Sequence, residues 1–197
     1  MARPRAYETA RVVAAAADVF WERGYQNTSI GDLEERTGLD RSSLYHAFGS
    51  KQALFAAALD CYVENSIDER LGGMRQPDAG LDSVAAFFGM MARAFGANPG
   101  MAKFGCLMVN TVAELGARDP ESARAGAAYR DRLREAFGAA LDRAAARGEV
   151  DAGRVHARAD LLASLTMGLF LTARIDPAGV VDVCESVAAE ISAWRLT

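Results

Sequence analysis

The side chains best suited to contact a polyanion lie close together in residues 39–51, LDRSSLYHAFGSK. Two cations, three serines, a tyrosine and a histidine occur in this stretch, and no acid follows Asp40. Guanidinium, ammonium and hydroxyl groups donate hydrogen bonds to phosphate oxygens and to base edges, so this set favours contact with nucleic acid. The candidate residues are Arg41, Ser42, Ser43, Tyr45, His46, Ser50 and Lys51.

A short helix that begins after Asp40 would present these side chains on one face. Asp is a favoured N-cap residue, and Leu39 and Leu44 occupy the N′ and N4 positions of a hydrophobic staple. Leu44 and Phe48 are four residues apart and are predicted to face the core together with Leu33. The remaining arc of the helix is then free to contact a partner.

Another short helix is predicted just before it. Thr28 and Ser29 are N-cap residues, Asp32 completes an approximate capping box, and Gly38 ends the helix. A longer helix that ends at Gly24 precedes both. Two short helices joined by a glycine-containing turn after a supporting helix are the layout of a helix-turn-helix, whose second helix enters the major groove of DNA. The free amides that follow Ser29 and Ser50 are predicted phosphate sites.

Residues 10–59 strongly resemble the N-terminal domain of the TetR/AcrR family of bacterial transcriptional repressors, through the motifs GYQNTSI and LYHAFGSK. The resemblance implies a larger all-helical ligand-binding and dimerisation domain, and two recognition helices in successive major grooves. Glu34 with Glu35, Asp40 and Ala47 depart from the common pattern, which affects the operator sequence rather than the fold. The DNA-contacting positions that the resemblance implies are Thr28, Ser29, Tyr45, His46 and Lys51.

Apolar residues recur at helical spacing through nearly all of the 197 residues, so an all-α fold of about nine helices is predicted. The composition, 51% hydrophobic and 24% charged, is that of a globular protein. The net charge of −4 does not favour nucleic acid, but the first 55 residues carry seven cations and seven acids, so the excess acid lies further along. Because neither a secretory signal nor an apolar run of membrane-spanning length occurs, a cytoplasmic location is expected.

Residues 72–80, with three glycines and Pro77, are the predicted domain boundary or flexible joint. We expect an N-terminal three-helix helix-turn-helix DNA-binding domain over residues 1–50 and a larger helical ligand-binding and dimerisation domain over residues 51–197. Beyond the joint, helices are predicted at about 81–97, 101–116, 120–147, 155–174 and 177–195.

A set of methionines and aromatic residues in the second domain is a candidate lining for a small apolar or amphipathic effector, because Met adapts to irregular cavities. Each member is also a normal core residue, and its polar members are equally suited to structural hydrogen bonds. The candidates are Phe87, Met90, Met91, Phe104, Cys106, Met108, Asn110, Tyr129, Phe137, Met167, Phe170 and Arg174.

Cys106 gives an alternative, a repressor that senses electrophiles or oxidants through this thiol. Residues 105–121, GCLMVNTVAELGARDPE, resemble a stretch in a subset of these regulators, some of which sense through such a cysteine. A thiol sensor needs a nearby cation or helix N-terminus and some solvent access. Lys103 supplies the cation, but a free cysteine in an apolar run is usually an inert hydrophobe. The three cysteines lack the spacing of a disulfide framework or zinc site.

The last two predicted helices are apolar over wide arcs. If each pair packs on its symmetry mate, the result is a two-fold four-helix interface; burial within one subunit is the alternative. The predicted interface residues are Leu161, Leu165, Leu169, Val183, Val187, Ile191 and Trp194.

Together these features predict a ligand-responsive repressor that binds a palindromic DNA operator as a homodimer and needs no cofactor or metal. An enzyme is disfavoured, because the two histidines, His46 and His156, form no Cys-His or Ser-His-Asp set. A helical interaction module without DNA binding is a further alternative, favoured by the acidic balance and the pair Glu34 and Glu35.

Overall fold

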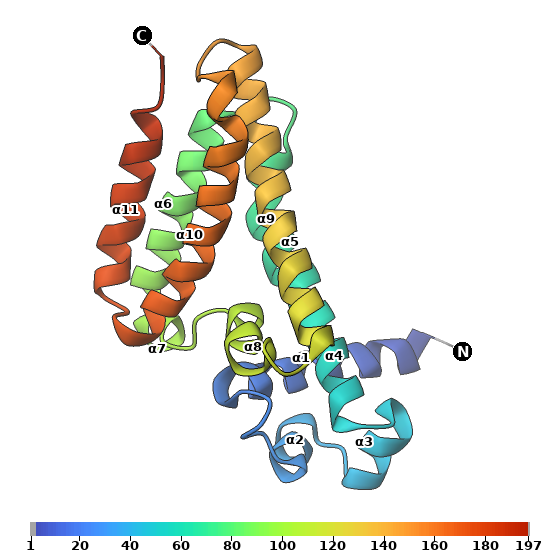
Figure 1. The fold of residues 1–197 in the computed structure, drawn as a ribbon. Coiled ribbons are helices and arrows are strands. Elements are labelled where there is room, and N and C mark those ends of the chain that lie inside the picture. Colours follow the sequence, from blue (N-terminus) through green and yellow to red (C-terminus); the bar gives the residue numbers. More distant parts are fainter. Residues whose placement is uncertain (1–2, 197) are drawn as a thin grey trace.

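The computed structural model describes residues 3–196, and every regular element within them is helical (Figure 1). Nine of these helices have eight residues or more, which confirms the predicted all-α fold of about nine helices. They are α1 (Arg3–Arg23), α2 (Ile30–Thr37), α3 (Arg41–Phe48), α4 (Lys51–Tyr62), α6 (Leu81–Ala97), α8 (Leu107–Leu115), α9 (Pro120–Ala146), α10 (Val155–Ile175) and α11 (Gly179–Ser192). The shorter elements are the α-helical turns α5 (Asp68–Leu71) and α7 (Pro99–Ala102), the π-helical turn η1 (Val63–Ile67), and the 3-10 turns η2 (Gly72–Arg75) and η3 (Ala152–Arg154).

Helices α1, α2, α3 and the first half of α4 form the N-terminal unit, at the lower end of the molecule in Figure 1. The rings of Phe20 and Phe55, with centroids 4.8 Å apart, join α1 to α4 in its core, and Leu33 and Leu44 enter from α2 and α3. Gly38 ends α2 with a φ of 74°, a left-handed conformation that glycine adopts without steric cost. The chain therefore turns directly from α2 into α3.

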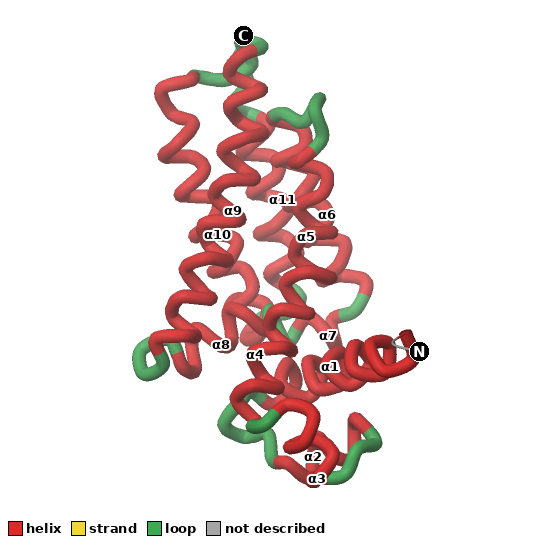
Figure 2. The backbone as a smooth tube through the Cα atoms, turned by 90° about the vertical axis from the view of Figure 1, so that its right-hand side faces the viewer, coloured by secondary structure: helices red, strands yellow, loops and turns green. Residues whose placement is uncertain are grey.

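The remaining helices form an elongated bundle that extends away from the N-terminal unit (Figure 2). In this bundle α9 packs against α10, and α6 packs along α11. Helix α4 continues through η1 into α5, so one nearly continuous rod links the N-terminal unit to the bundle. No helix within residues 3–196 combines the length and the apolar character needed to cross a membrane.

Most predicted boundaries agree with the structure within about two residues, but the helix predicted at 101–116 is wrong. The chain forms α7 there, turns at Gly105 with a φ of 67°, and restarts as α8. Residues 72–80 are also less free than a flexible joint. Met74 and Ala79 are buried, and the Arg143 guanidinium of α9 donates hydrogen bonds to their carbonyl oxygens, at 2.5 and 3.1 Å.

The division at residues 50 and 51 remains a prediction. Helix α4 begins at Lys51, yet its first half packs on α1 and completes the core of the N-terminal unit through Phe55. The same helix then runs on into the bundle. It therefore contributes to both halves of the molecule.

Candidate nucleic-acid interface

The start of α3 is held by two acids. The carboxylate of Asp40 accepts a hydrogen bond from the amide of Ser43 at 2.7 Å, which confirms the predicted N-cap. That hydrogen bond, together with others from Ser43 and Ser42, lowers the pKa of Asp40. Glu34 of α2 accepts a further hydrogen bond from the amide of Arg41 at 2.6 Å. Glu34, one of the residues that depart from the family pattern, thus stabilises the turn between α2 and α3. The sequence pattern did not indicate this role.

Helix α3 divides into a buried edge and an exposed polar face, as the spacing predicted. Leu44 is only 3% exposed, and Phe48 packs against the same core. The guanidinium of Arg41 lies over the ring of Tyr45, 5.6 Å from its centroid, and Tyr45 is 39% exposed. The exposed residues of this face are Arg41, Ser42, Ser43, Tyr45, His46 and Ala47.

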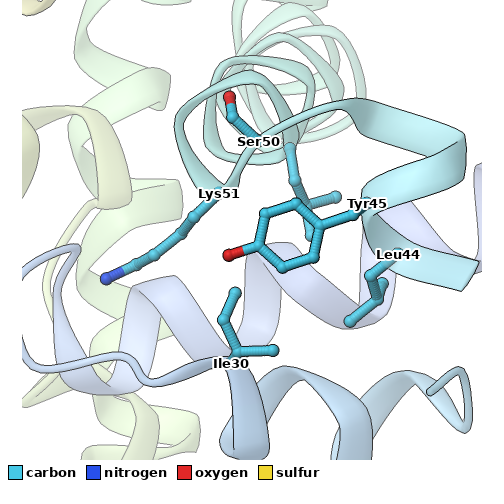
Figure 3. A pocket seen from close by; sticks show the side chains of 6 residues that line it. Ile30, Leu44, Tyr45, Ser50 and Lys51 are labelled. Carbon is cyan, nitrogen blue, oxygen red and sulfur yellow. The ribbon is translucent and has the colours of Figure 1, made fainter. Parts of the chain in front are cut away.

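The first turn of α4 lies beside this face. Ser50 caps α4 by accepting a hydrogen bond from the amide of Ala53 at 3.0 Å. The ammonium of Lys51 lies 4.4 Å from the ring centroid of Tyr25. Partial burial lowers the pKa of Lys51, and the charges of Glu114 and Asp32 act in the opposite direction. Figure 3 shows the Tyr45 hydroxyl and the Lys51 ammonium pointing to the same side of the N-terminal unit.

The hydroxyls of Thr28 and Ser29 both make hydrogen bonds within the N-terminal unit. Thr28 is 1% exposed, and its hydroxyl donates to the carbonyl oxygen of Gly24 at 2.6 Å, so this hydroxyl is directed inward. Ser29 forms the full capping box with Asp32: its hydroxyl accepts from the Asp32 amide, and the Asp32 carboxylate accepts from the Ser29 amide. An acid already occupies this helix start, so it is a poorer phosphate site than the start of α4.

The exposed face of α3 and the first turn of α4 offer a chemically coherent surface. Arg41 and Ser42 lie in the first turn of a short helix, the part of a recognition helix that contacts base edges in the major groove. Tyr45 and Lys51 offer a hydroxyl and an ammonium suited to phosphate oxygens. The arrangement suits the binding of duplex DNA.

Helix α8 of the bundle is hydrogen-bonded to the N-terminal unit at both of its ends. At its start, the indole Nε1 of Trp21 donates to the carbonyl oxygen of Gly105 at 3.1 Å. At its end, the Glu114 carboxylate accepts hydrogen bonds from the amides of Tyr25 and Gln26, at 3.0 and 2.7 Å. These partners are more than 80 residues apart in the chain, so no local sequence pattern indicates the contacts.

Part of the predicted effector lining forms the core of the bundle. Phe87 and Phe137 pack edge to face with centroids 5.3 Å apart, and both contact Phe88. Met91 and Phe170 are 3% and 4% exposed, and Met90 and Met167 pack against the same core. The rings of Phe87 and Phe137 fill the space between α6 and α9 themselves, and their contact with an effector stays a prediction.

Four predicted residues line openings. Asn110 and Arg174 border a space of about 360 Å³ beside Trp21 and Glu114. Met108 and Tyr129 are part of the α4–α9 pocket, a half-open space of about 240 Å³ whose walls come from α4, η1, α8 and α9. The sequence did not single out the other residues that line this pocket. They are Asp60, Val63, Glu64, Ala125, Ala128 and Arg132.

The predicted polar candidates bond to each other. Arg174 donates to the side-chain oxygen of Asn110 at 2.7 Å, and the Asn110 amide donates to the carbonyl oxygen of Phe104 at 2.7 Å. The ring of Phe104 lies 6.0 Å from that of Trp21. Asn110 and Arg174 thus help hold α8 against α10. Cys106 is 0% exposed, so the solvent access that thiol sensing requires is absent in this conformation.

The predicted dimer residues divide into two groups. Leu169 and Ile191 are 2% and 1% exposed, so their side chains belong to the core of one subunit, which corrects the prediction for these two. Leu161 and Val183 are 57% and 42% exposed. The partly buried members are Leu165, Val187 and Trp194. The sequence pattern missed two further apolar side chains on α10, Leu171 and Ile175, which are 44% and 86% exposed.

Residues 12–58 match the family described as bacterial regulatory proteins, tetR family. The chain is 32% identical over 151 residues to YezE of Bacillus subtilis strain 168, an uncharacterized HTH-type transcriptional regulator, and the match covers 77% of each chain. It is also 31% identical over 114 residues to the HTH-type transcriptional repressor ComR of Escherichia coli K12. That match covers 57% of this chain and 53% of ComR.

Solved structures of other proteins share this fold, two of them as follows. A TetR transcriptional regulator from Chloroflexus aurantiacus J-10-FL is 28% identical, covers 99% of this chain and 100% of its own, and superimposes with a TM-score of 0.85. A cysteine mutant of the TetR family regulator CifR, solved with a 26-bp double-strand operator DNA, is also 28% identical, covers 90% of this chain and 93% of its own, and has a TM-score of 0.76. The chain belongs to the TetR family of helix-turn-helix transcriptional regulators.

Proposed function

We propose that the protein is a repressor that binds a palindromic DNA operator as a homodimer and releases it when a small apolar or amphipathic effector binds. The observation that carries this proposal is the exposed polar face of α3 beside Lys51. Its first-turn residues Arg41 and Ser42 would contact base edges, and Tyr45 and Lys51 would contact phosphates. The CifR relative in complex with a 26-bp operator supports the same mode of binding.

A homodimer is favoured by the exposed apolar side chains of the last two long helices. Leu161, Leu171 and Ile175 lie along one side of α10, and Val183 lies on α11. Exposed apolar side chains along one side of a long helix are typical of a protein–protein interface. If α10 and α11 pack across a two-fold axis, the dimer presents two copies of α3, one for each half of a palindrome.

Release by an effector requires a connection between the bundle and α3. Helix α8 supplies one, because it forms a wall of the α4–α9 pocket and is bonded at both ends to the N-terminal unit. A ligand that moves α8 would shift α1 and the turn after it. The spacing of the two α3 helices would then no longer match successive major grooves.

The test is selection of operators from a library of duplexes with 26 randomised base pairs, a length taken from the CifR complex. The expected product is an inverted repeat, bound by two chains, whose half-site duplex binds far more weakly. Sedimentation equilibrium of the free protein checks the dimer. Retention of all duplexes with equal affinity, or enrichment of a motif without two-fold symmetry, would contradict the proposal.

A further inference from the structure

A cluster of four polar side chains lies inside the bundle where α4, α5, α8 and α9 meet. Tyr62 ends α4, Arg70 lies in α5, Cys106 caps α8 and Tyr129 projects from α9. Tyr62 and Tyr129 are 9% and 3% exposed, and Cys106 is 0% exposed. The hydroxyl of Tyr62 and the Nη1 of Arg70 are buried, and neither makes a well-formed hydrogen bond among residues 3–196, although the Tyr62 hydroxyl lies close to both Arg70 and Cys106.

The guanidinium of Arg70, which is half-buried with its Nη1 inside the bundle, is the less usual of the two groups. It lies over the ring of Phe170, 5.6 Å from the centroid. The neighbouring acid Glu69 is exposed, and Asp68 is bonded instead to Arg75 at 2.7 Å and to Arg132 at 3.3 Å. A buried N–H donor of a cation that lacks an acceptor is unfavourable, because this nitrogen has lost its hydration and gained little in return. An anion at this place would satisfy it.

The two tyrosines complete a set of donors. Burial, with a further contribution from the Cys106 thiol, raises the pKa of Tyr62 and of Tyr129, and the charge of Arg70 lowers both by a smaller amount. Both hydroxyls therefore stay protonated at neutral pH. Protonated hydroxyls and a guanidinium are together the groups that bind an oxyanion.

The α4–α9 pocket borders this cluster at Tyr129, which belongs to both. Val63, Met108, Ala125 and Ala128 give the pocket an apolar wall. The chain widens into the π-helical turn η1 next to Tyr62, the kind of local distortion often found at functional sites. The mouth carries both signs of charge, from Asp60, Glu64 and Arg132, so selection for an anion would fall to Arg70.

We propose that Arg70, Tyr62 and Tyr129 form the acid-binding end of the effector site, and that the effector is a small amphipathic carboxylate whose apolar tail lies in the α4–α9 pocket. The inference rests on the proposed function and names the class of its ligand. The cluster is also well placed to act on DNA binding. Cys106 directly follows Gly105, whose carbonyl oxygen accepts the hydrogen bond from Trp21 of the N-terminal unit.

The first experiment measures binding of decanoate by titration calorimetry to the full-length protein in the absence of DNA. Decan-1-ol has the same tail without the charge and is the matched control ligand. Decanoate is expected to bind at least about tenfold more tightly than the alcohol, because a hydrogen bond to a charged group is stronger than one to a neutral group. Hexanoate and phenylacetate extend the test to shorter and aromatic tails.

Variants then assign the binding to the cluster. Arg70→Met keeps a similar volume without the charge and is expected to weaken decanoate binding by about ten- to a hundredfold while leaving decan-1-ol unchanged. Arg70→Lys should recover part of the loss. Tyr62→Phe removes one hydroxyl and should weaken decanoate binding by a smaller factor. Arg158→Met is the control, because Arg158 is another arginine with a buried, unpartnered Nη1, placed over Trp194.

The outcomes separate this inference from the proposed function. If the carboxylates fail to bind, bind no better than the alcohol, or bind Arg70→Met as well as the parent protein, the acid-binding site is wrong. If decanoate binds through Arg70 but does not release a selected operator duplex, the site holds and the proposed ligand response fails. Circular dichroism melting of each variant shows that the comparison is between folded proteins.

Discussion

The carboxylate of Glu114 lies 3.0 Å from the amide nitrogen of Tyr25, across 89 residues of sequence. A second hydrogen bond, from the Gln26 amide at 2.7 Å, completes the contact. Glu114 thus satisfies two backbone donors in the turn between α1 and α2. The same turn carries the ring that lies under the ammonium of Lys51. A movement of α8 would therefore be transmitted to Lys51, the proposed phosphate contact, through the hydrogen bond of Glu114 to Tyr25 and the contact of Tyr25 with Lys51.

Loss of the Glu114 side chain should uncouple the bundle from the N-terminal unit. Glu114→Ala is expected to lower the free energy of unfolding by about 1–2 kcal/mol, since two amides lose a charged acceptor in a partly exposed site. Urea denaturation measures this. Glu114→Gln keeps one acceptor oxygen and should lose less, and Glu135→Ala on the exposed face of α9 is the control. Equal stability of Glu114→Ala and the control would show that the contact has no energetic role.

The turn at Gly105 should tolerate no side chain. Its φ is 67°, and an added Cβ would lie 2.8 Å from the carbonyl oxygen of Phe170. Gly148 has a similar φ of 74°, but an added Cβ there meets nothing within 4 Å, so Gly148→Ala is a matched control for backbone strain alone. Gly148→Ala should lower the free energy of unfolding by about 1 kcal/mol, and Gly105→Ala should lower it by about 1–3 kcal/mol more. Thermal melting compares them, and equal costs would contradict the close approach.

Local patterns were sufficient to predict α2 and α3, because their limits depend on neighbouring residues. Asp40 caps α3 and Gly38 ends α2 within the same few residues. Thr28 shows the limit of such reasoning. It is an N-cap residue by type, but its hydroxyl bonds back to Gly24, four residues earlier. Hydroxyls that bond to preceding carbonyl groups are common, and the residue type does not distinguish the two.

The bundle was predicted less well, because its contacts join distant segments. Periodicity shows that α10 and α11 are apolar, but not which arc faces the core of the same subunit. Leu169 is buried, whereas Ile175 is 86% exposed. The contact of Glu114 with Tyr25 depends on how α8 packs on α1, which no spacing within either helix determines.

Acid should weaken the cap of α3. Because hydrogen bonding lowers the pKa of Asp40 below its ordinary value of 3.8, the folded state favours the carboxylate. This contribution to stability is fully present above pH 3.8 and is lost as the pH falls through the lower folded pKa. Asp40→Asn keeps a capping oxygen without a charge, so it should remove this part of the dependence of stability on pH. Urea denaturation below and above pH 3.8 tests it, with Asp142→Asn on α9 as control.

Lys51→Ala should weaken binding to every duplex, because an ammonium on a phosphate carries no sequence information. The slope of log K against log salt should become shallower by about 1 for each phosphate that the variant no longer neutralises. Arg41→Ala, in contrast, should relax the preference at one position of each half-site if its guanidinium contacts a base. Fluorescence polarisation on selected and scrambled duplexes distinguishes the two. Arg154→Ala is the control, because this exposed arginine lies in η3, at the opposite end of the bundle (Figure 1). An unchanged salt slope for Lys51→Ala would exclude a phosphate contact.

A charge at Ile175 should separate the proposed dimer. This side chain is 86% exposed at the end of α10. Facing its symmetry mate or a neighbouring apolar side chain, a glutamate would be desolvated without a partner, at a cost of several kcal/mol. Ile175→Glu should therefore shift sedimentation equilibrium towards the monomer and lower affinity for a full palindrome to about that for a half-site, while the melting temperature of the isolated subunit stays close to the parent's.

Ala127→Glu adds the same charge to an exposed position on α9 and should leave the assembly intact. If Ile175→Glu remained as dimeric as Ala127→Glu, the subunits would have to associate through another surface. Leu161→Glu would then show whether any part of the exposed face of α10 takes part.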